Sequence, residues 1–262
     1  MQKVSSRDGT SVAFWRDGTG PALLLVHGAT ADHTTISRFI GPAFAERFSV
    51  YAMDRRGRGG SGDSAAYDLE REAEDIAAVI DSIGEPVNVF GHSYGGLCAL
   101  EAALLTKNVQ RLVLYEGVPW NGEKLYPPGF IDHCQALLDA GDVDGMLLAV
   151  FRDLVHMPPA ELELLRSHRE AWAVRLGNAR TLPREMNVES KYVFLPQRFA
   201  HMSTPTLLLV GGESPSHELD NARMIAEALP NARVAILPGQ QHIAVYTAPD
   251  LVVREVAQFI EQ

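Results

Sequence analysis

The six residues 91–96 (GHSYGG) constrain the fold of this chain more than any other segment. They follow a short apolar run at 87–90 and precede a helical stretch of small and apolar residues at 97–105. A G-x-S-x-G turn between a strand and a helix is the setting of a nucleophile elbow. Glycine is needed beside the serine because so tight a turn leaves almost no room for side chains. The motif predicts a sheet with flanking helices and makes Ser93 the candidate nucleophile, at a helix N-terminus that stabilises developing negative charge.

Strand-like and helix-like segments alternate along most of the chain. Seven apolar runs are predicted as strands: 12–15, 22–26, 49–53, 87–90, 111–115, 206–210 and 233–236. Several are apolar throughout, as expected for parallel strands that are covered on both faces. A helix is predicted to end at Gly84, a suitable C-terminal cap, and the last helix to begin at Pro249. The pattern predicts an α/β fold with a mostly parallel, doubly wound sheet that binds ligands at the carboxyl ends of its strands.

The alternation stops between Glu116 and Pro205. This stretch contains helical patterns near 131–140, 144–157 and 159–176, without a convincing strand. We therefore expect an α/β core formed by 1–116 and 201–262, and a helical cap formed by 117–200 that covers the active site. Because Trp120 follows the predicted strand end at Glu116 so closely, we expect it to bind substrate.

Charge and cysteine content exclude several classes of function. The formal net charge of −10 disfavours nucleic acid and anionic membrane surfaces as partners. Two cysteines, Cys98 and Cys134, make no disulfide framework, and no His, Cys and Asp residues have the spacing of a metal site, so we expect neither a metal nor another cofactor. The polar N-terminus and the lack of a long apolar run favour a cytoplasmic protein, and nothing indicates its oligomeric state.

A serine nucleophile needs a base, and His242 is the strongest candidate among the nine histidines. It lies between the last predicted strand and the final helix, late in the chain and after the serine, as this architecture requires. His27, at a strand end, is interpreted as an anchor of its loop, and His92 cannot easily turn toward the adjacent Ser93.

An oxyanion hole requires two backbone amides that point at one position. One is expected from Tyr94, the residue after the nucleophile. The other is expected from Ala29, in the loop after the strand at 22–26. Thr30 is the alternative to Ala29, and its hydroxyl is a second candidate contact for substrate.

Four segments together resemble the α/β-hydrolase fold family over essentially the whole chain. They are 27–28 (HG), 54–61 (DRRGRGGS), 91–96 and 238–242 (PGQQH). The resemblance implies an eight-stranded, mostly parallel sheet with a helical cap. The three arginines of 54–61 also suggest a phosphate site, but the corresponding loop of relatives is structural, so we interpret it as a solvated, salt-bridged loop.

The triad acid departs from the usual pattern of the family. Most relatives carry an aspartate after the strand that corresponds to 206–210, where this chain has Pro215. Some dehalogenases and lactone hydrolases instead carry a glutamate after the strand that follows the elbow helix, and Glu116 stands at that place. A carboxylate that ends a buried strand is rarely left unpaired. Glu116 is thus our first candidate, and the carboxylates of the later loop stay open as alternatives: Glu213, Glu218 and Asp220.

Serine, histidine and a carboxylate imply acyl transfer to water. Haloalkane dehalogenases and epoxide hydrolases of this fold use an aspartate nucleophile, so Ser93 argues against both. The best prediction is hydrolysis of a small apolar carboxylic ester or lactone by a Ser-His-Glu mechanism. Two alternatives remain: a cofactor-free perhydrolase or haloperoxidase-like activity, and a ligand-binding protein that retains the scaffold without turnover.

Overall fold

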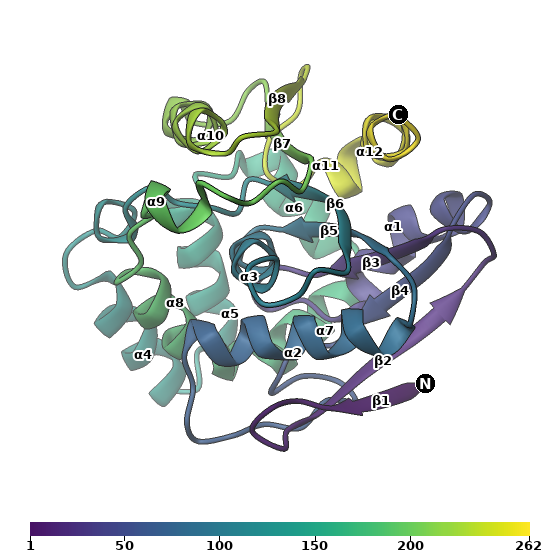
Figure 1. Cartoon of the computed structure of the whole chain (residues 1–262). Helices are drawn as coiled ribbons and strands as arrows, with labels where there is room; N and C mark the ends of the chain where they lie inside the picture. Colours follow the sequence, from purple (N-terminus) through teal and green to yellow (C-terminus); the bar gives the residue numbers. More distant parts are fainter.

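The computed structural model describes all residues, 1–262, and is built around one eight-stranded sheet (Figure 1). The strands lie in the order β1-β2-β4-β3-β5-β6-β7-β8. Strands β1 and β4 both run antiparallel to β2, and the other neighbouring pairs are parallel. The bounds are β1 Gln2–Ser5, β2 Ser11–Asp17, β3 Ala22–Val26, β4 Ser49–Met53, β5 Val87–His92, β6 Val109–Tyr115, β7 Thr206–Gly211 and β8 Ala232–Leu237. The mostly parallel, eight-stranded α/β fold is confirmed.

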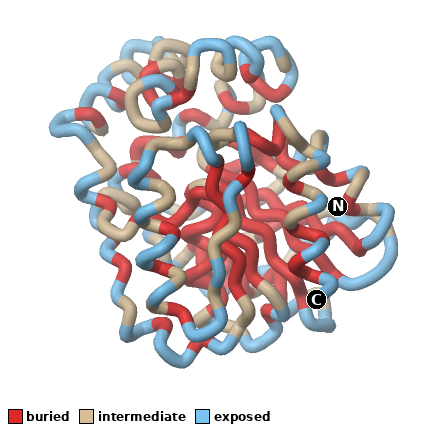
Figure 2. Tube along the Cα trace, turned by 90° about the horizontal axis from the view of Figure 1, so that it is seen from above, coloured by how far each residue is buried: buried red, intermediate tan, exposed pale blue.

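Helices cover both faces of the sheet. The helices of the core are α1 His33–Ala45, α2 Leu69–Ile83, α3 Tyr94–Ala102, α10 Ser216–Ala228, α11 Ala244–Thr247 and α12 Pro249–Ile260. Successive residues of β3 alternate between the two apolar layers: Leu23 lies in the layer that contains Phe44 of α1, whereas Leu24 lies in the layer that contains Ile76 of α2. The buried residues accordingly run through the central strands (Figure 2). No helix is both long and apolar enough to cross a membrane.

The seven strands expected from apolar runs are all present, and β1 is the one the sequence pattern did not indicate. Its four residues are largely exposed and lie at the sheet edge, paired only with β2. A strand without a buried face carries no apolar run, because its backbone pairing alone holds it in the sheet.

Between β6 and β7 the chain is helical, and we call residues 116–205 the helical insertion. It contains η1 Gly122–Lys124, α4 Phe130–Asp139, α5 Val143–Ala149, η2 Val150–Leu154, α6 Pro159–Ser167, α7 Arg169–Asn178, η3 Ala179–Thr181, α8 Leu182–Glu189 and α9 Pro196–Phe199. The single helix expected over 159–176 is two helices, because the backbone of His168 leaves the helical region (ψ 70°). The division into a core and a cap at 117–200 stays a prediction.

The arginine-rich loop at 54–61 is salt-bridged, as expected, but the expectation that it is solvated is wrong. Arg55, Arg56 and Arg58 are at most 1% exposed. Arg55 is paired with Glu72 at 2.7 Å, and Arg56 with Asp75 at 2.7 Å. A buried guanidinium needs such partners because transfer out of water is costly. The two pairs fix the loop against α2, and Arg58 is ion-paired with Glu185 of α8. Each of the three cations thus already has a carboxylate partner, which argues against a phosphate site.

The close approach of the backbone after β3 to the start of α3 explains why residue 95 is a glycine. A Cβ at this position would lie 2.2 Å from the His27 carbonyl oxygen. We expect Gly95→Ala to lower the free energy of unfolding by about 1–3 kcal/mol, because the backbone must move apart to admit the methyl group. Urea denaturation measures the change. Gly177→Ala is the matched control, since no atom lies within 4 Å of its added Cβ, and an equal loss there would contradict the steric argument.

Candidate active site

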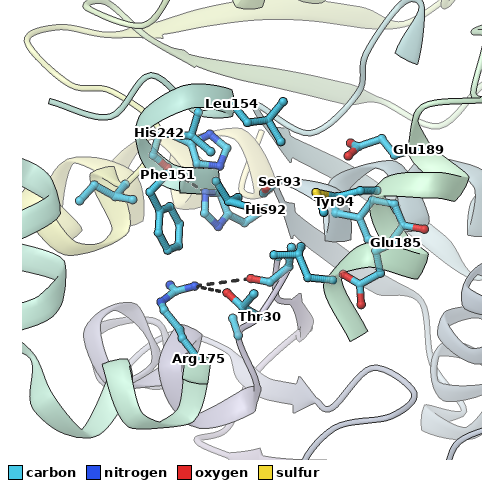
Figure 3. Close-up of a pocket in the computed structure, with 18 of the residues that line it drawn as sticks. Thr30, His92, Ser93, Tyr94, Phe151, Leu154, Arg175, Glu185, Glu189 and His242 are labelled. Atoms are coloured by element: carbon cyan, nitrogen blue, oxygen red, sulfur yellow. Dashed lines mark hydrogen bonds between the residues drawn. The ribbon is translucent and has the colours of Figure 1, made fainter. Parts of the chain in front are cut away.

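The parallel strands end at one edge of the sheet, where Ser93, Tyr94, His242 and Thr30 lie around one pocket (Figure 3). Ser93 connects β5 to α3 with φ 53° and ψ −138°, a conformation that non-glycine residues rarely adopt. The neighbouring loop approaches so closely that a Cβ on Gly28 would lie 2.9 Å from Ser93 Cβ. The elbow therefore presents the serine hydroxyl directly against the loop that follows β3.

Glu116 follows β6 and is hydrogen-bonded to His242. Its Oε2 lies 2.9 Å from His242 Nδ1, and its Oε1 accepts hydrogen bonds from the Gly211 amide and the Ser214 hydroxyl, both at 2.6 Å. Burial alone raises the pKa of Glu116, but the hydrogen bond and charge of His242, with the two other donors, outweigh it and lower the pKa below its usual value. The carboxylate is thus held in its charged form against the imidazole.

The later carboxylates make no hydrogen bond to His242. Glu218 lies 3.6 Å from His217, and Glu213 and Asp220 form no ion pair. The structure therefore brings one of the four acid candidates, Glu116, to the histidine.

His242 lies on the loop after β8, with its side chain 15% exposed. Burial disfavours its charged form, but the hydrogen bond and charge of Glu116 outweigh this and raise its pKa above the ordinary value. When Nδ1–H donates to Glu116, the lone pair of Nε2 is available to accept a proton. His242 and Ser93 line the same pocket, and no hydrogen bond joins them in this structure.

His92 and Tyr115 support the His242 loop, a role that sequence reasoning missed. His92 Nε2 lies 2.8 Å from the His242 carbonyl oxygen, and the Tyr115 hydroxyl donates to the Gln241 carbonyl. Burial lowers the pKa of His92, so its ring is neutral and Nε2–H can donate to that carbonyl. Their position at the ends of β5 and β6 is the sequence signal that would have indicated this role.

The oxyanion candidates Ala29, Thr30 and Tyr94 line the pocket with Ser93. Thr30 has a positive φ of 61°, and its hydroxyl accepts a hydrogen bond from Arg175 at 3.0 Å. Tyr94 opens α3, which places its amide at the helix N-terminus. Three segments that are distant in sequence thus meet around the serine.

The pocket has 19 lining residues, 11 of them hydrophobic. The helical insertion supplies much of the apolar wall, including Phe151 and Leu154 of η2 and Met186 of α8. Trp120 is not among the lining residues, although we expected it to bind substrate. Its ring lies 5.1 Å from that of Phe194, and the adjacent backbone forms an isolated bridge between Asn121 and Val193. The expected contact of Trp120 with substrate does not fit this position.

Three charged residues of the insertion also line the pocket, and no sequence motif indicated them: Arg175, Glu185 and Glu189. Burial raises the pKa of Glu189 to about 7, and the Tyr126 hydroxyl donates to it at 2.5 Å. Glu185 is ion-paired with Arg58 of the buried loop. The apolar pocket therefore has polar groups at fixed places in its wall.

Asp32, His33 and Asp54 bring three possible metal-ligand atoms within 4.8 Å of one another. Both carboxylates already serve the backbone, since Asp32 accepts from the Thr35 amide at 3.0 Å and Asp54 from the Gly60 amide at 2.7 Å. Their contacts account for the group as an organiser of α1 and of the loop after β4.

A model of the alpha/beta hydrolase family matches residues 23–255, so the chain belongs to this family. The solved structure of an alpha/beta hydrolase from Sphaerobacter thermophilus is 35% identical, covers 99% of this chain and 100% of that one, and superposes with a TM-score of 0.84. A Haemophilus influenzae protein provisionally described as an esterase/lipase is 24% identical over 92% of this chain and 84% of its own. An esterase from Exiguobacterium antarcticum shares the fold, with a TM-score of 0.79 and 19% identity over 100% and 99% of the two chains.

Proposed function

We propose that this protein hydrolyses a small carboxylic ester or lactone through an acyl-enzyme on Ser93, with His242 as general base and Glu116 as the triad acid. The observation that carries the proposal is the 2.9 Å contact between Glu116 and His242, in a pocket that also exposes the elbow serine. The same reaction is supported by the membership of this chain in the alpha/beta hydrolase family and by its similarity to proteins described as esterases.

The chemistry follows from the arrangement. As Ser93 Oγ attacks the carbonyl carbon, His242 Nε2 takes its proton, and Glu116 stabilises the imidazolium. The amides of Tyr94 and Ala29 stabilise the oxyanion. The tetrahedral intermediate then collapses, and the imidazolium gives its proton to the leaving alkoxide, which in a lactone stays attached as the opened ring. His242 then deprotonates a water molecule, which attacks the acyl-enzyme. When this second tetrahedral intermediate collapses, the imidazolium returns the proton to Ser93 Oγ, and the carboxylic acid leaves.

The helical insertion is proposed to act as a cap over this site. Its residues Phe151, Leu154 and Met186 line the same pocket as Ser93. Removal of water by apolar walls strengthens the electrostatic contacts on which acyl transfer depends. Apolar parts of the acyl or ring portion would pack against these side chains.

Covalent labelling tests the proposal directly. A fluorophosphonate should add one adduct, located by peptide mass spectrometry at Ser93, and the wild type should hydrolyse members of a graded panel of esters and lactones. Acetate with peroxide tests for perhydrolysis. Labelling at another residue would overturn the assignment of Ser93, and a labelled protein without hydrolytic turnover would overturn the proposed activity.

The pH profile should report the raised pKa of His242. The general base must be neutral, so kcat/KM should rise with pH through a midpoint above 6.5, the ordinary pKa of histidine. In Glu116→Gln the contact that raises the pKa is gone, while burial, which lowers it, remains. NMR titration of the imidazole should then give a midpoint below that of the wild type. A midpoint that stays the same would show that Glu116 does not control this histidine.

Substrate preference should depend on Phe151 rather than on Trp120. Phe151→Ala removes pocket wall, so we expect relative kcat/KM among acyl chains of different length to change by about tenfold or more. Trp120→Ala leaves the pocket lining intact and should reduce thermal stability while changing all substrates equally. A specificity change in Trp120→Ala alone would restore the position expected from the sequence.

A further inference from the structure

Arg175 differs from every other buried arginine of the chain. Four arginines are buried, and three of them are paired with carboxylates: Arg55, Arg56 and Arg58. Arg175, which α7 places in the pocket wall, is 5% exposed and has no carboxylate within ion-pair distance. A buried charge without a counter-ion is costly, and no carboxylate of the folded chain neutralises this one.

Neutral groups accept hydrogen bonds from only some of the N–H donors of the Arg175 guanidinium. Nη1 donates to the Thr30 hydroxyl at 3.0 Å and lies 3.5 Å from the Ala29 carbonyl oxygen, and Nη2 donates to the Tyr246 hydroxyl at 2.8 Å. Nε is buried without a partner. The rings of Phe151 and Tyr246 flank the group, with centroids 5.6 and 5.7 Å from Cζ. These contacts hold the guanidinium beside the loop of Ala29 and Thr30 without neutralising its charge.

The pocket is electrically asymmetric. Arg175 reaches the site from one side of Ser93, and the carboxyl groups of Glu185 and Glu189 lie on the other (Figure 3). Glu185 is ion-paired with Arg58, and burial raises the pKa of Glu189 to about 7, whereas Arg175 has no carboxylate partner. A negatively charged ligand group is therefore attracted to the Arg175 side. Between them stand mostly apolar side chains, which weaken electrostatic contacts much less than water does.

We propose that the substrate is an ester or lactone that itself carries a carboxylate, and that Arg175 binds this carboxylate. The inference rests on the proposed function for the ester bond, whereas the anion site is a separate claim about Arg175. The planar fork of arginine suits a carboxylate, and a carboxylate supplies the missing counter-ion. The position of Arg175 in the pocket wall then fixes the orientation in which such a molecule binds.

Binding without turnover tests the anion site by itself. Monomethyl glutarate and dimethyl glutarate share an acyl chain and differ in one charge. In the Ser93→Ala background, calorimetry should show tighter binding of the monoester by about tenfold or more. Arg175→Met should abolish this difference, and the matched control Arg169→Met, on the exposed face of the same helix, should retain it. Equal binding of both esters to Ser93→Ala would overturn the proposal.

Kinetics separate substrate recognition from loop positioning. Arg175→Met should lower kcat/KM for the monoester by about 100-fold and for the diester by less than tenfold. Asn178→Ala removes hydrogen bonds from α7 to the Thr30 and Ala31 carbonyl oxygens without a change in charge, so it should affect both esters equally. An equal loss for both esters in Arg175→Met would show that Arg175 only positions the loop.

Two further results keep the claims distinct. Arg175→Lys retains the charge but not the planar guanidinium, so it should keep part of the preference for the monoester. It provides a second test in case Arg175→Met folds poorly. Charge-dependent binding with no turnover of any ester by the wild type would overturn the proposed hydrolysis and leave the anion site. Turnover of both methyl esters without preference for the monoester would overturn the anion site and leave the hydrolysis.

Discussion

Ser93→Ala should lower kcat for ester hydrolysis by about 10⁴- to 10⁶-fold, the largest effect expected of any single substitution in this chain. The hydroxyl is the proposed attacking group, and alanine offers no nucleophile in its place. Residual turnover would come from water activated within the oxyanion site. Stopped assays with a chromogenic ester measure the loss.

Stability separates this loss from a folding defect. Ser93 Oγ makes no hydrogen bond in the structure, so its removal leaves no polar group without a partner, and the free energy of unfolding should stay within about 0.5 kcal/mol of the wild type. Ser190→Ala, which removes an exposed hydroxyl at the end of α8, should be as stable and fully active. Wild-type rates in Ser93→Ala would place the nucleophile elsewhere.

Much of the frame of this site could be predicted because it depends on local pattern. The apolar runs at 22–26 and 49–53 coincide with β3 and β4, since strands buried on both faces leave a continuous apolar signal. Parallel strands end at one edge, so the residues after β5, β6 and β8 could be brought together before any coordinates. Ser93, Glu116 and His242 come from those three positions.

The sequence did not indicate the positions of side chains that depend on side-chain direction or on contacts between distant segments. Trp120 is close to Glu116 in sequence, but its ring packs beside Phe194 and does not line the pocket. Arg58 is buried by Glu185, which lies 127 residues further along the chain. Arg175 meets Thr30 across 145 residues, and no spacing rule anticipates such a contact. Local sequence pattern thus predicted which residues lie at the carboxyl edge of the sheet. The polar residues of the pocket wall could be identified only from the tertiary structure.

Glu116→Gln should lower kcat by about two to four orders of magnitude, on the analogy of the aspartate-to-asparagine change in a serine protease triad. Glutamine keeps the shape of the side chain, and its carbonyl oxygen can still accept from the Gly211 amide and the Ser214 hydroxyl. Its amide N–H then points at His242 Nδ1. This favours the tautomer that carries its proton on Nε2, which cannot accept the proton of Ser93, and the imidazolium loses its counter-ion.

The carboxylates of the later loop provide matched controls for this variant. Glu213→Gln removes one negative charge from the loop after β7, and Glu218→Gln and Asp220→Asn each remove one from α10. None of these residues is hydrogen-bonded to His242. Each should retain kcat within about tenfold of the wild type, since its charge acts on the imidazole only at a distance. The assay is the same ester hydrolysis at a pH on the plateau of the wild-type profile. A large loss in one of these three, with little change in Glu116→Gln, would assign the acid to the later loop and make the 2.9 Å contact of Glu116 a structural one.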